Sequence, residues 1–345
     1  MAEKTFRNKI YWFTFLFSVL VIWVHSYNAV LFLGNTKSAA SLVRLERFFG
    51  DRIAQIAVPG FFMISSYLFF RGYRPEILMR KWNSRIRSVL VPYIVWNSLY
   101  YFGYVIGSRL PYISDVIGKG KIPFGLPETG DAILNYTYNY VFWYLYQLIL
   151  LILLAPLIYL AVKRVWPGIA FLAVLLAGVY LGIDLPLLNL DALFYYSFAA
   201  FAAVHGKAVV EGVWTRKRLL AGIALMIAGC ISLGTDLPGS SLGEAASVTV
   251  VYRLLVPVGL WLTVPEERLF EARDFMKNNF FLYAVHFALV RLINKTGALL
   301  LPPVPVLAFL LFFFMPLFAV VLSWLAGGLI RRLMPAVWRL LNGGR

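Results

Sequence analysis

Long apolar runs separated by short charged connections dominate the whole chain. A transmembrane helix needs about 20 mostly apolar residues, and these runs approach or exceed that length. The pattern therefore predicts an all-α, polytopic membrane protein with about ten spans, whose boundaries are set to within a few residues. The expected spans are residues 10–33, 53–70, 89–107, 133–162, 166–183, 191–205, 217–234, 247–264, 279–297 and 304–330.

The connections between these runs are short. No loop exceeds about 30 residues, which is too few for a typical soluble domain. We therefore expect one integral-membrane domain over residues 1–345 with no appended soluble domain. The first run is longer than the apolar part of a cleaved signal peptide and continues as a full span. Residues 35–52 are expected to lie along the outer surface as an amphipathic stretch.

Composition and charge agree with the hydropathy pattern. The chain is 61% hydrophobic, whereas soluble domains are about 45–50% apolar. A net charge of +16 would indicate nucleic acid on a soluble protein, but here it marks cytoplasmic loops, and no nucleic-acid partner is expected. The single cysteine, Cys230, excludes an internal disulfide and a cysteine-based metal site. No metal is expected.

The basic residues also predict an orientation. With the N-terminus inside, 22 of the 32 lysines and arginines lie in inner segments and eight in outer segments. Lysine and arginine collect on the cytoplasmic side of membrane proteins. Both termini are therefore expected in the cytoplasm.

A histidine interrupts the first apolar run, in the sequence IWVHSYN. Thr14, Ser18, His25 and Asn28 share one helical face. Such a stripe is expected to face the bundle interior or a water-filled cavity. At 1.5 Å per residue, His25 lies about 22 Å from the inner end of a core about 30 Å thick, in the outer half. The residues alone leave two interpretations open: a structural histidine bridging two helices, or a functional site.

The ninth run carries a second polar stripe, with Asn279, Tyr283, His286 and Asn294 at helical spacing. Two arginines, Arg253 and Arg291, also lie within expected spans. Arg253 has no obvious partner in the sequence and is expected either to pair with a carboxylate or to bind an anionic group.

Two clusters flank other spans. Arg80, Lys81, Arg85 and Arg87 crowd the inner end of the third span. Arginine grips phosphate with two parallel hydrogen bonds, so the cluster fits a phosphate-bearing cytosolic ligand, anionic lipid headgroups or ordinary inside-positive bias. Aromatic residues including Trp143 and Tyr144 mark the start of the fourth span. They form either an interfacial belt or a platform for stacking sugars.

Several soluble chemistries are absent. The chain has no phosphate-binding glycine loop, no nucleophile elbow and no HExxH zinc motif. With histidine only at positions 25, 205 and 286, any catalysis must use few residues.

Taken together, these segments resemble the membrane acyltransferase 3 family. The blocks that carry the resemblance follow in the family's order along most of the chain. They are VIWVHSYN, then VPGFFMISSYLFF (58–70), SRIRSVLVPYIVW (84–96), VFWYLYQLILLILLAPLI (141–158) and NNFFLYAVHFALV (278–290). Two positions depart from the family pattern. Thr14 stands eleven residues before His25, where the family commonly has arginine, and Ser66 replaces the usual glycine. The chain is therefore similar to a divergent branch.

The resemblance implies transfer of an acyl group, acetyl in the first instance, from cytosolic acyl-CoA to a hydroxyl of a sugar or other cell-envelope acceptor. No permanently bound cofactor is implied. His25 would act as general base or carry the acyl group itself. The chain would lie in a bacterial inner (plasma) membrane.

The roles of further residues follow from the same resemblance. The acyl-CoA phosphates would contact Arg80, Lys81, Arg85 and Arg87, and the acceptor would contact Trp143, Tyr144 and Arg253. Supporting polar residues would be Thr14, Ser18, Asn28, Ser65, Tyr283 and His286.

Two other classes remain open at this stage. A transporter or flippase for a glycan or lipid-linked substrate would use the same polar interior without chemistry, whereas a non-catalytic scaffold would need no polar stripes. Transfer of label from acyl-CoA distinguishes an enzyme from both. Nothing in the sequence indicates an oligomeric state.

Overall fold

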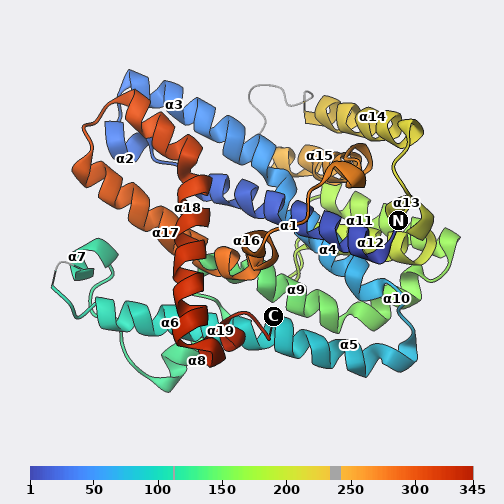
Figure 1. Ribbon diagram of the computed structural model, residues 1–345, viewed down its shortest axis with the longest axis horizontal. Coiled ribbons are helices and arrows are strands. Elements are labelled where there is room, and N and C mark those ends of the chain that lie inside the picture. The colour runs from blue at the N-terminus through green and yellow to red at the C-terminus, as the bar shows by residue number, and fades with distance from the viewer. Residues whose placement is uncertain (112, 234–241, 345) are drawn as a thin grey trace. The chain divides into compact units, whose positions relative to one another are not determined.

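The computed structural model describes residues 1–111, 113–233 and 242–344 (Figure 1). Over these residues the regular structure is helical, and no β-strand occurs among them. This agrees with the predicted all-α class. Residue 234, the last of the expected seventh span, lies outside the described residues.

The described chain divides into two compact units, each of which is considered by itself. Unit 1 contains Met1–Pro75 and Leu154–Leu325, and unit 2 contains Glu76–Leu153 and Ala326–Arg345.

Unit 1 holds most of the helices, including both histidine-bearing segments of the predicted site. Its elements are α1 (Glu3–His25), α2 (Ala29–Leu33), α3 (Lys37–Arg47), η1 (Phe48–Arg52), η2 (Ile53–Ile56), α4 (Ala57–Phe70), α10 (Ala155–Val162), α11 (Val165–Tyr180), α12 (Leu190–His205), α13 (Lys207–Val210), α14 (Arg216–Leu233), α15 (Leu242–Thr263), η6 (Glu266–Arg268), α16 (Asp274–Lys277), α17 (Asn279–Leu300) and α18 (Pro305–Leu333) up to residue 325.

Unit 2 holds the basic cluster and the aromatic cluster. After the short turn η3 (Pro75–Ile77), its elements are α5 (Leu78–Arg85), η4 (Ile86–Leu90), α6 (Val91–Gly107), α7 (Ile113–Ile117), α8 (Leu126–Leu134), η5 (Tyr140–Phe142), α9 (Trp143–Leu153), the end of α18 and α19 (Pro335–Leu341).

Four helical segments in the described chain are long and apolar enough to cross a membrane. They are Glu3–Leu33, Lys37–Phe70, Pro75–Gly107 and Pro305–Leu333. The pair Tyr140–Leu153 and Ala155–Val162, bent by 62°, adds a fifth when it is counted as one broken span. Val165–Tyr180 and Thr249–Thr263 are shorter apolar helices. The described chain therefore carries several candidate membrane spans, as a membrane protein does, while the count of ten and the cytoplasmic termini stay predictions.

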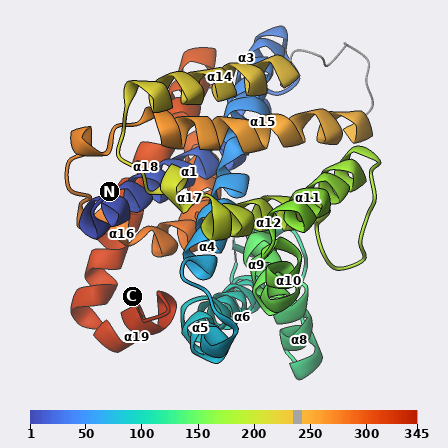
Figure 2. The same cartoon turned by 90° about the vertical axis from the view of Figure 1, so that its right-hand side faces the viewer.

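An apolar core joins the first helix to its neighbours in unit 1. Phe13, Phe17 and Val21 of α1 pack against Ala57 at the start of α4 and Val256 of α15. Next to this core, α14 and α15 lie side by side (Figure 2). Their backbones approach closely at Gly222 and Gly259, where a Cβ atom on either residue would stand 2.6 Å from the other's carbonyl oxygen. Small residues allow this close packing of membrane helices.

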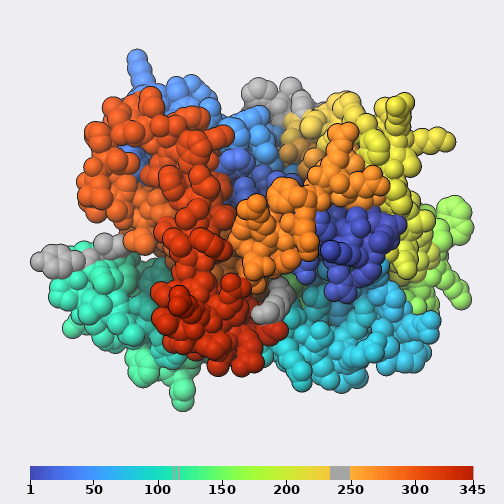
Figure 3. All heavy atoms as spheres, viewed as in Figure 1, coloured from blue at the N-terminus to red at the C-terminus, as the bar shows by residue number. Residues whose placement is uncertain are grey.

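The N-terminal end of α1 is fixed to the segment that follows α15. Asn8 Nδ2 donates to the carbonyl of Phe270 (3.0 Å), and the Ala272 amide donates to Asn8 Oδ1 (2.7 Å). Lys9 is buried and donates to the Val264 carbonyl (2.7 Å). Figure 3 shows the dark blue N-terminal residues at the surface beside this orange segment.

Aromatic side chains fasten the helices of unit 2 to one another. The indole of Trp82 on α5 donates to the carbonyl of Ile152 on α9 (2.9 Å), and that of Trp96 on α6 donates to the carbonyl of Leu341 on α19 (3.0 Å). Tyr93 donates to the carbonyl of Ile133 on α8 (2.6 Å). The basic side chains of α5 are thus carried on an anchored helix.

Candidate functional site

The first membrane segment is broken immediately after its histidine. α1 ends at His25, and α2 begins at Ala29. The expected span over residues 10–33 falls within the candidate span Glu3–Leu33, but residues 26–28 are not helical, so Asn28 lies in the break rather than on the helical stripe. At the end of α1, the Ser26 hydroxyl donates back to the Ile22 carbonyl (2.6 Å) and closes the last turn.

Two side chains from elsewhere in unit 1 satisfy the backbone groups freed by this break. Glu46 of α3, only 2% exposed, accepts hydrogen bonds from the amides of Asn28 (2.9 Å) and Ala29 (3.0 Å). Asn294 of α17 donates to the carbonyls of Ser26 (3.3 Å) and Tyr27 (3.4 Å). Unsatisfied backbone groups cost several kcal/mol each in the membrane interior, so these contacts permit a break at that position.

Sequence reasoning missed the role of Glu46. Its segment was expected along the outer surface, but α3 buries Ala39, Leu42 and Glu46. These residues follow one another at intervals of three and four, so they share one helical face. A single carboxylate on an otherwise apolar face was the signal available in the sequence.

The two predicted polar stripes meet along α1 and α17. At one end, Asn279 Nδ2 donates to the Thr14 carbonyl (2.8 Å). Farther along, the rings of His25 and His286 lie with centroids 5.3 Å apart. Beyond them, Asn28 Nδ2 lies 3.4 Å from Asn294 Oδ1. The sequence predicted each stripe separately, and the fold brings them together.

The histidine pair combines a half-buried ring with a fully buried one. His25 is half-buried and meets Phe287 edge to face, with centroids 5.4 Å apart. His286 is 1% exposed, and its Nδ1 lies 2.5 Å from the Tyr283 carbonyl. Because a carbonyl can only accept, Nδ1 carries the proton and Nε2 is left as an acceptor. That Nε2 is buried and has no hydrogen-bond partner among the described residues.

The other supporting residues have different surroundings. The Thr14 hydroxyl donates to carbonyls of its own helix, Ile10 (2.9 Å) and Tyr11 (3.1 Å). Ser18 is buried, and its Oγ has no hydrogen-bond partner among the described residues. Ser65 is half-buried on α4.

The neighbouring Ser66, which stands where the family has glycine, joins two helices. It is fully buried, and its hydroxyl donates to the Tyr196 carbonyl of α12 (2.5 Å).

Arg253 of α15 has partners on two other elements of unit 1. Its Nη1 lies 3.7 Å from Asp191 Oδ2 at the start of α12, and its Nη2 donates to Gln55 Oε1 of η2 (3.1 Å). Its Nε is buried without a hydrogen-bond partner among the described residues. Asp191 is the first residue of the expected sixth span. A carboxylate at the end of an apolar run was the signal in the sequence for a partner of Arg253.

The candidate CoA and sugar residues of unit 2 lie on two of its helices. Arg80, Lys81 and Arg85 belong to α5, and Arg87 follows in the π-helical turn η4. Arg80 and Arg87 are exposed, whereas Lys81 and Arg85 are half-buried. At the start of α9, Trp143 is half-buried and Tyr144 is buried. Tyr144 therefore offers little surface to a sugar in this arrangement of unit 2.

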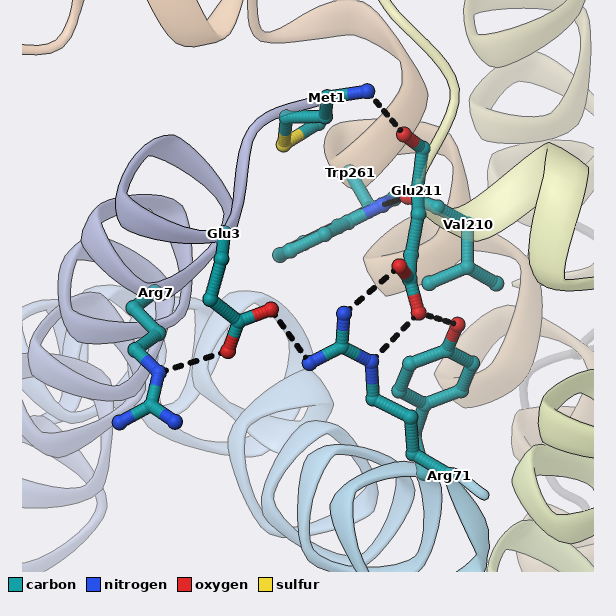
Figure 4. Close-up of polar contacts among 8 residues, drawn as sticks. Met1, Glu3, Arg7, Arg71, Val210, Glu211 and Trp261 are labelled. Carbon is teal, nitrogen blue, oxygen red and sulfur yellow. Dashed lines mark hydrogen bonds and ion pairs between the residues drawn. The ribbon is translucent and has the colours of Figure 1, made fainter.

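A charged network that the sequence did not reveal surrounds Arg71, directly after α4 (Figure 4). Arg71 binds both carboxylate oxygens of Glu211 (2.7 and 2.8 Å) and Glu3 Oε2 (2.8 Å). The Tyr67 hydroxyl donates to Glu211 (2.7 Å), and the Met1 ammonium donates to the Glu211 carbonyl (3.0 Å). Burial alone would raise the pKa of Glu211, but the bonds from Arg71 and Tyr67 outweigh it and hold this pKa below 4.5.

Comparison with known proteins covers nearly the whole chain. The family model described as Acyltransferase domain (Acyl_transf_3) matches residues 10–327, which include both polar stripes and the basic cluster. The succinoglycan biosynthesis protein ExoH of Rhizobium meliloti (strain 1021) is 29% identical over 336 residues, covering 91% of this chain and 85% of that protein. No solved structure matches the chain.

Proposed function

Because this chain belongs to the acyltransferase 3 family, we propose that it moves an acyl group from cytosolic acyl-CoA to a sugar hydroxyl of a cell-envelope polysaccharide. Acetyl is the first candidate for the group transferred. The name of the succinoglycan biosynthesis relative supports a polysaccharide acceptor. The observation that carries the proposal is the histidine pair at the break between α1 and α2, where His25 is half-buried and His286 is fully buried.

In this reaction His25 is the general base. A sugar hydroxyl is a weak nucleophile until its proton is removed, and general-base help contributes about 10²–10⁴-fold. The hydroxyl oxygen bonds to the thioester carbonyl carbon, and the carbon–sulfur bond breaks. The proton passes through the imidazole to the departing CoA thiolate. Neutral imidazole suits this exchange because it is a base near neutral pH.

His286 positions the base. Its Nδ1 proton is committed to the Tyr283 carbonyl, so its Nε2 presents a lone pair in a dry environment beside the His25 ring. This lone pair is suited to accept a hydrogen bond from His25 or from the reacting hydroxyl. An acceptor of this kind selects one tautomer of the catalytic ring and holds its orientation.

The basic residues of α5 and η4 are the proposed CoA contacts. Three arginines and a lysine lie within Arg80–Arg87, and Trp82 holds α5 by its bond to the Ile152 carbonyl. CoA carries a pyrophosphate and a further phosphate, and guanidinium groups bind phosphate oxygens in pairs. Arg253, with a buried Nε lacking a partner among the described residues, is the proposed acceptor contact.

The proposal is tested with purified protein, labelled acetyl-CoA or succinyl-CoA, and polysaccharide acceptor. His25→Ala is expected to reduce labelled product at least 100-fold, because the acceptor hydroxyl loses its base. The matched control is His205→Ala, since His205 bonds to the Val162 carbonyl (2.8 Å) away from the pair. The control is expected to keep the wild-type rate within about twofold. Full activity of His25→Ala, or glycan movement by wild type without label transfer, would overturn the proposal.

A further inference from the structure

Unit 1 contains an apolar cavity of about 340 Å³ between α1, α4, α12 and α15. Its wall includes Phe13 and Phe17 of α1, Met63 of α4, Ala202 of α12 and Val258 of α15. Neither histidine of the proposed catalytic pair lines it. The volume lies within the range of about 300–1,000 Å³ that is usual for ligand pockets.

Small residues on facing helices account for the space. Gly60 on α4 allows the Phe17 ring to pack directly against the helix backbone, because a Cβ atom there would overlap the ring. Ala199 and Ala202 have short side chains, so they leave space beside the facing side of α12. Apolar space favours hydrocarbon, since even an engineered apolar cavity of about 150 Å³ binds benzene.

Three polar side chains of the wall direct their hydrogen bonds into protein among the described residues. The Tyr67 hydroxyl donates to Glu211 (2.7 Å), and the Trp261 indole donates to the Val210 carbonyl (2.9 Å). His205 Nε2 lies 2.8 Å from the Val162 carbonyl. A sugar or a pantetheine amide that enters this cavity would leave its polar groups without hydrogen-bond partners, which is unfavourable. A hydrocarbon chain has no such cost.

The wall reaches the surface where α12 passes into α13. His205 and Val209 both line the cavity and are exposed. Lys207 lies between them in the chain and is also exposed. With the N-terminus inside, Lys207 is one of the 22 basic residues counted in inner segments. The cytoplasmic leaflet carries the anionic lipids that attract basic residues. A chain that enters between these residues would leave its headgroup near a cation.

We propose that this cavity binds one acyl chain of an anionic phospholipid from the surrounding bilayer, with the phosphate at Lys207. The cavity supplies apolar surface of matching chemistry, and Lys207 supplies the complementary charge. Lipid binding at this site does not depend on acyl transfer, so the two proposals succeed or fail separately.

The test uses the full chain in mild detergent and phosphatidylglycerol with a diazirine at the end of one chain. After irradiation, we expect label on peptides containing Met63, Phe198 or Trp261. Ala202→Phe fills the cavity and is expected to reduce this label at least tenfold. The matched control is Ala221→Phe on an exposed position of α14, which is expected to leave labelling unchanged.

Competition on the wild-type protein keeps the test decisive even when Ala202→Phe fails to fold. Unlabelled dioleoyl phosphatidylglycerol is expected to displace the probe, whereas dihexanoyl phosphatidylglycerol at equal concentration is not, because its chains are too short to fill the cavity. Lys207→Gln is expected to lower the preference for phosphatidylglycerol over phosphatidylcholine about threefold or more. Absence of label from the cavity peptides, equal competition by both lipids or an unchanged headgroup preference would overturn the proposal.

Discussion

Single residues determine whether the break after His25 can exist in a membrane. One carboxylate, Glu46, binds two amides of the break, and one carboxamide, Asn294, binds two carbonyls. These four contacts join positions between 17 and 268 residues apart. Local propensity therefore could not have located the break, although the polar residues themselves are visible in the sequence.

Glu46→Ala is expected to destabilise the protein by about 2–3 kcal/mol, because two buried amides lose their acceptor. Glu46→Gln keeps one acceptor oxygen and is expected to cost less. Thermal unfolding in detergent measures both, with Glu267→Ala as the control at an exposed position. Equal stability of Glu46→Ala and wild type would show that the two amides do not depend on this carboxylate.

His286→Phe tests the positioning role of the second histidine. It preserves an aromatic ring but removes the Nε2 acceptor, so kcat is expected to fall about tenfold or more with little change in the KM for acyl-CoA. The pH profile of kcat is expected to shift as well, because His25 loses its neighbour. Steady-state kinetics across pH measure both effects. An unchanged kcat and pH profile would reduce His286 to a packing residue.

At the scale of elements, the seam between α1 and α17 organises the proposed site. Hydrophobic periodicity predicted both segments, and helical spacing predicted a polar stripe on each. What spacing cannot supply is the partner, since a polar stripe fits any complementary surface. Contacts at Thr14, His25 and Asn28 show that the partner is the other stripe.

Asn279→Leu and Thr14→Val distinguish the hydrogen bond to the Thr14 carbonyl from any role of the Thr14 hydroxyl. Asn279→Leu removes the donor to the Thr14 carbonyl and is expected to cost about 0.5–1.5 kcal/mol of stability. Thr14→Val keeps that carbonyl and removes a hydroxyl bonded only to its own helix, so activity should stay within about twofold. Thermal unfolding and the acyl-transfer rate measure these changes. A loss of activity in Thr14→Val comparable to that of His25→Ala would restore Thr14 to the site.

At the scale of the whole molecule, charge shaped the sequence predictions in two ways. The excess of basic residues indicated an orientation, which stays a prediction. Arg71 was counted only as part of that excess. It binds Glu211, which follows α13, and Glu3, which begins α1. Composition shows how many charges a segment carries, but not which distant carboxylate each will meet.

The Arg71–Glu211 pair predicts an acid-sensitive contribution to stability. The pKa of Glu211 is lower in the folded protein than its ordinary value of 4.5. Its contribution is therefore complete above pH 4.5 and is lost as pH falls through the folded pKa. Unfolding measured from pH 3 to 6 is expected to show a smaller acid-dependent loss in Glu211→Gln than in wild type. Identical pH dependence of the two proteins would contradict the assigned shift.

The sequence by itself determined that the chain is helical and lies in a membrane, because bilayer thickness imposes a local requirement on apolar length. It also predicted candidate residues for chemistry, through helical spacing and family motifs, and the match over residues 10–327 confirms the family. Only the tertiary structure decided where the first helix breaks, which stripe His25 meets and where a cavity forms. These features depend on contacts between distant segments, and their free energy arises only when the helices pack.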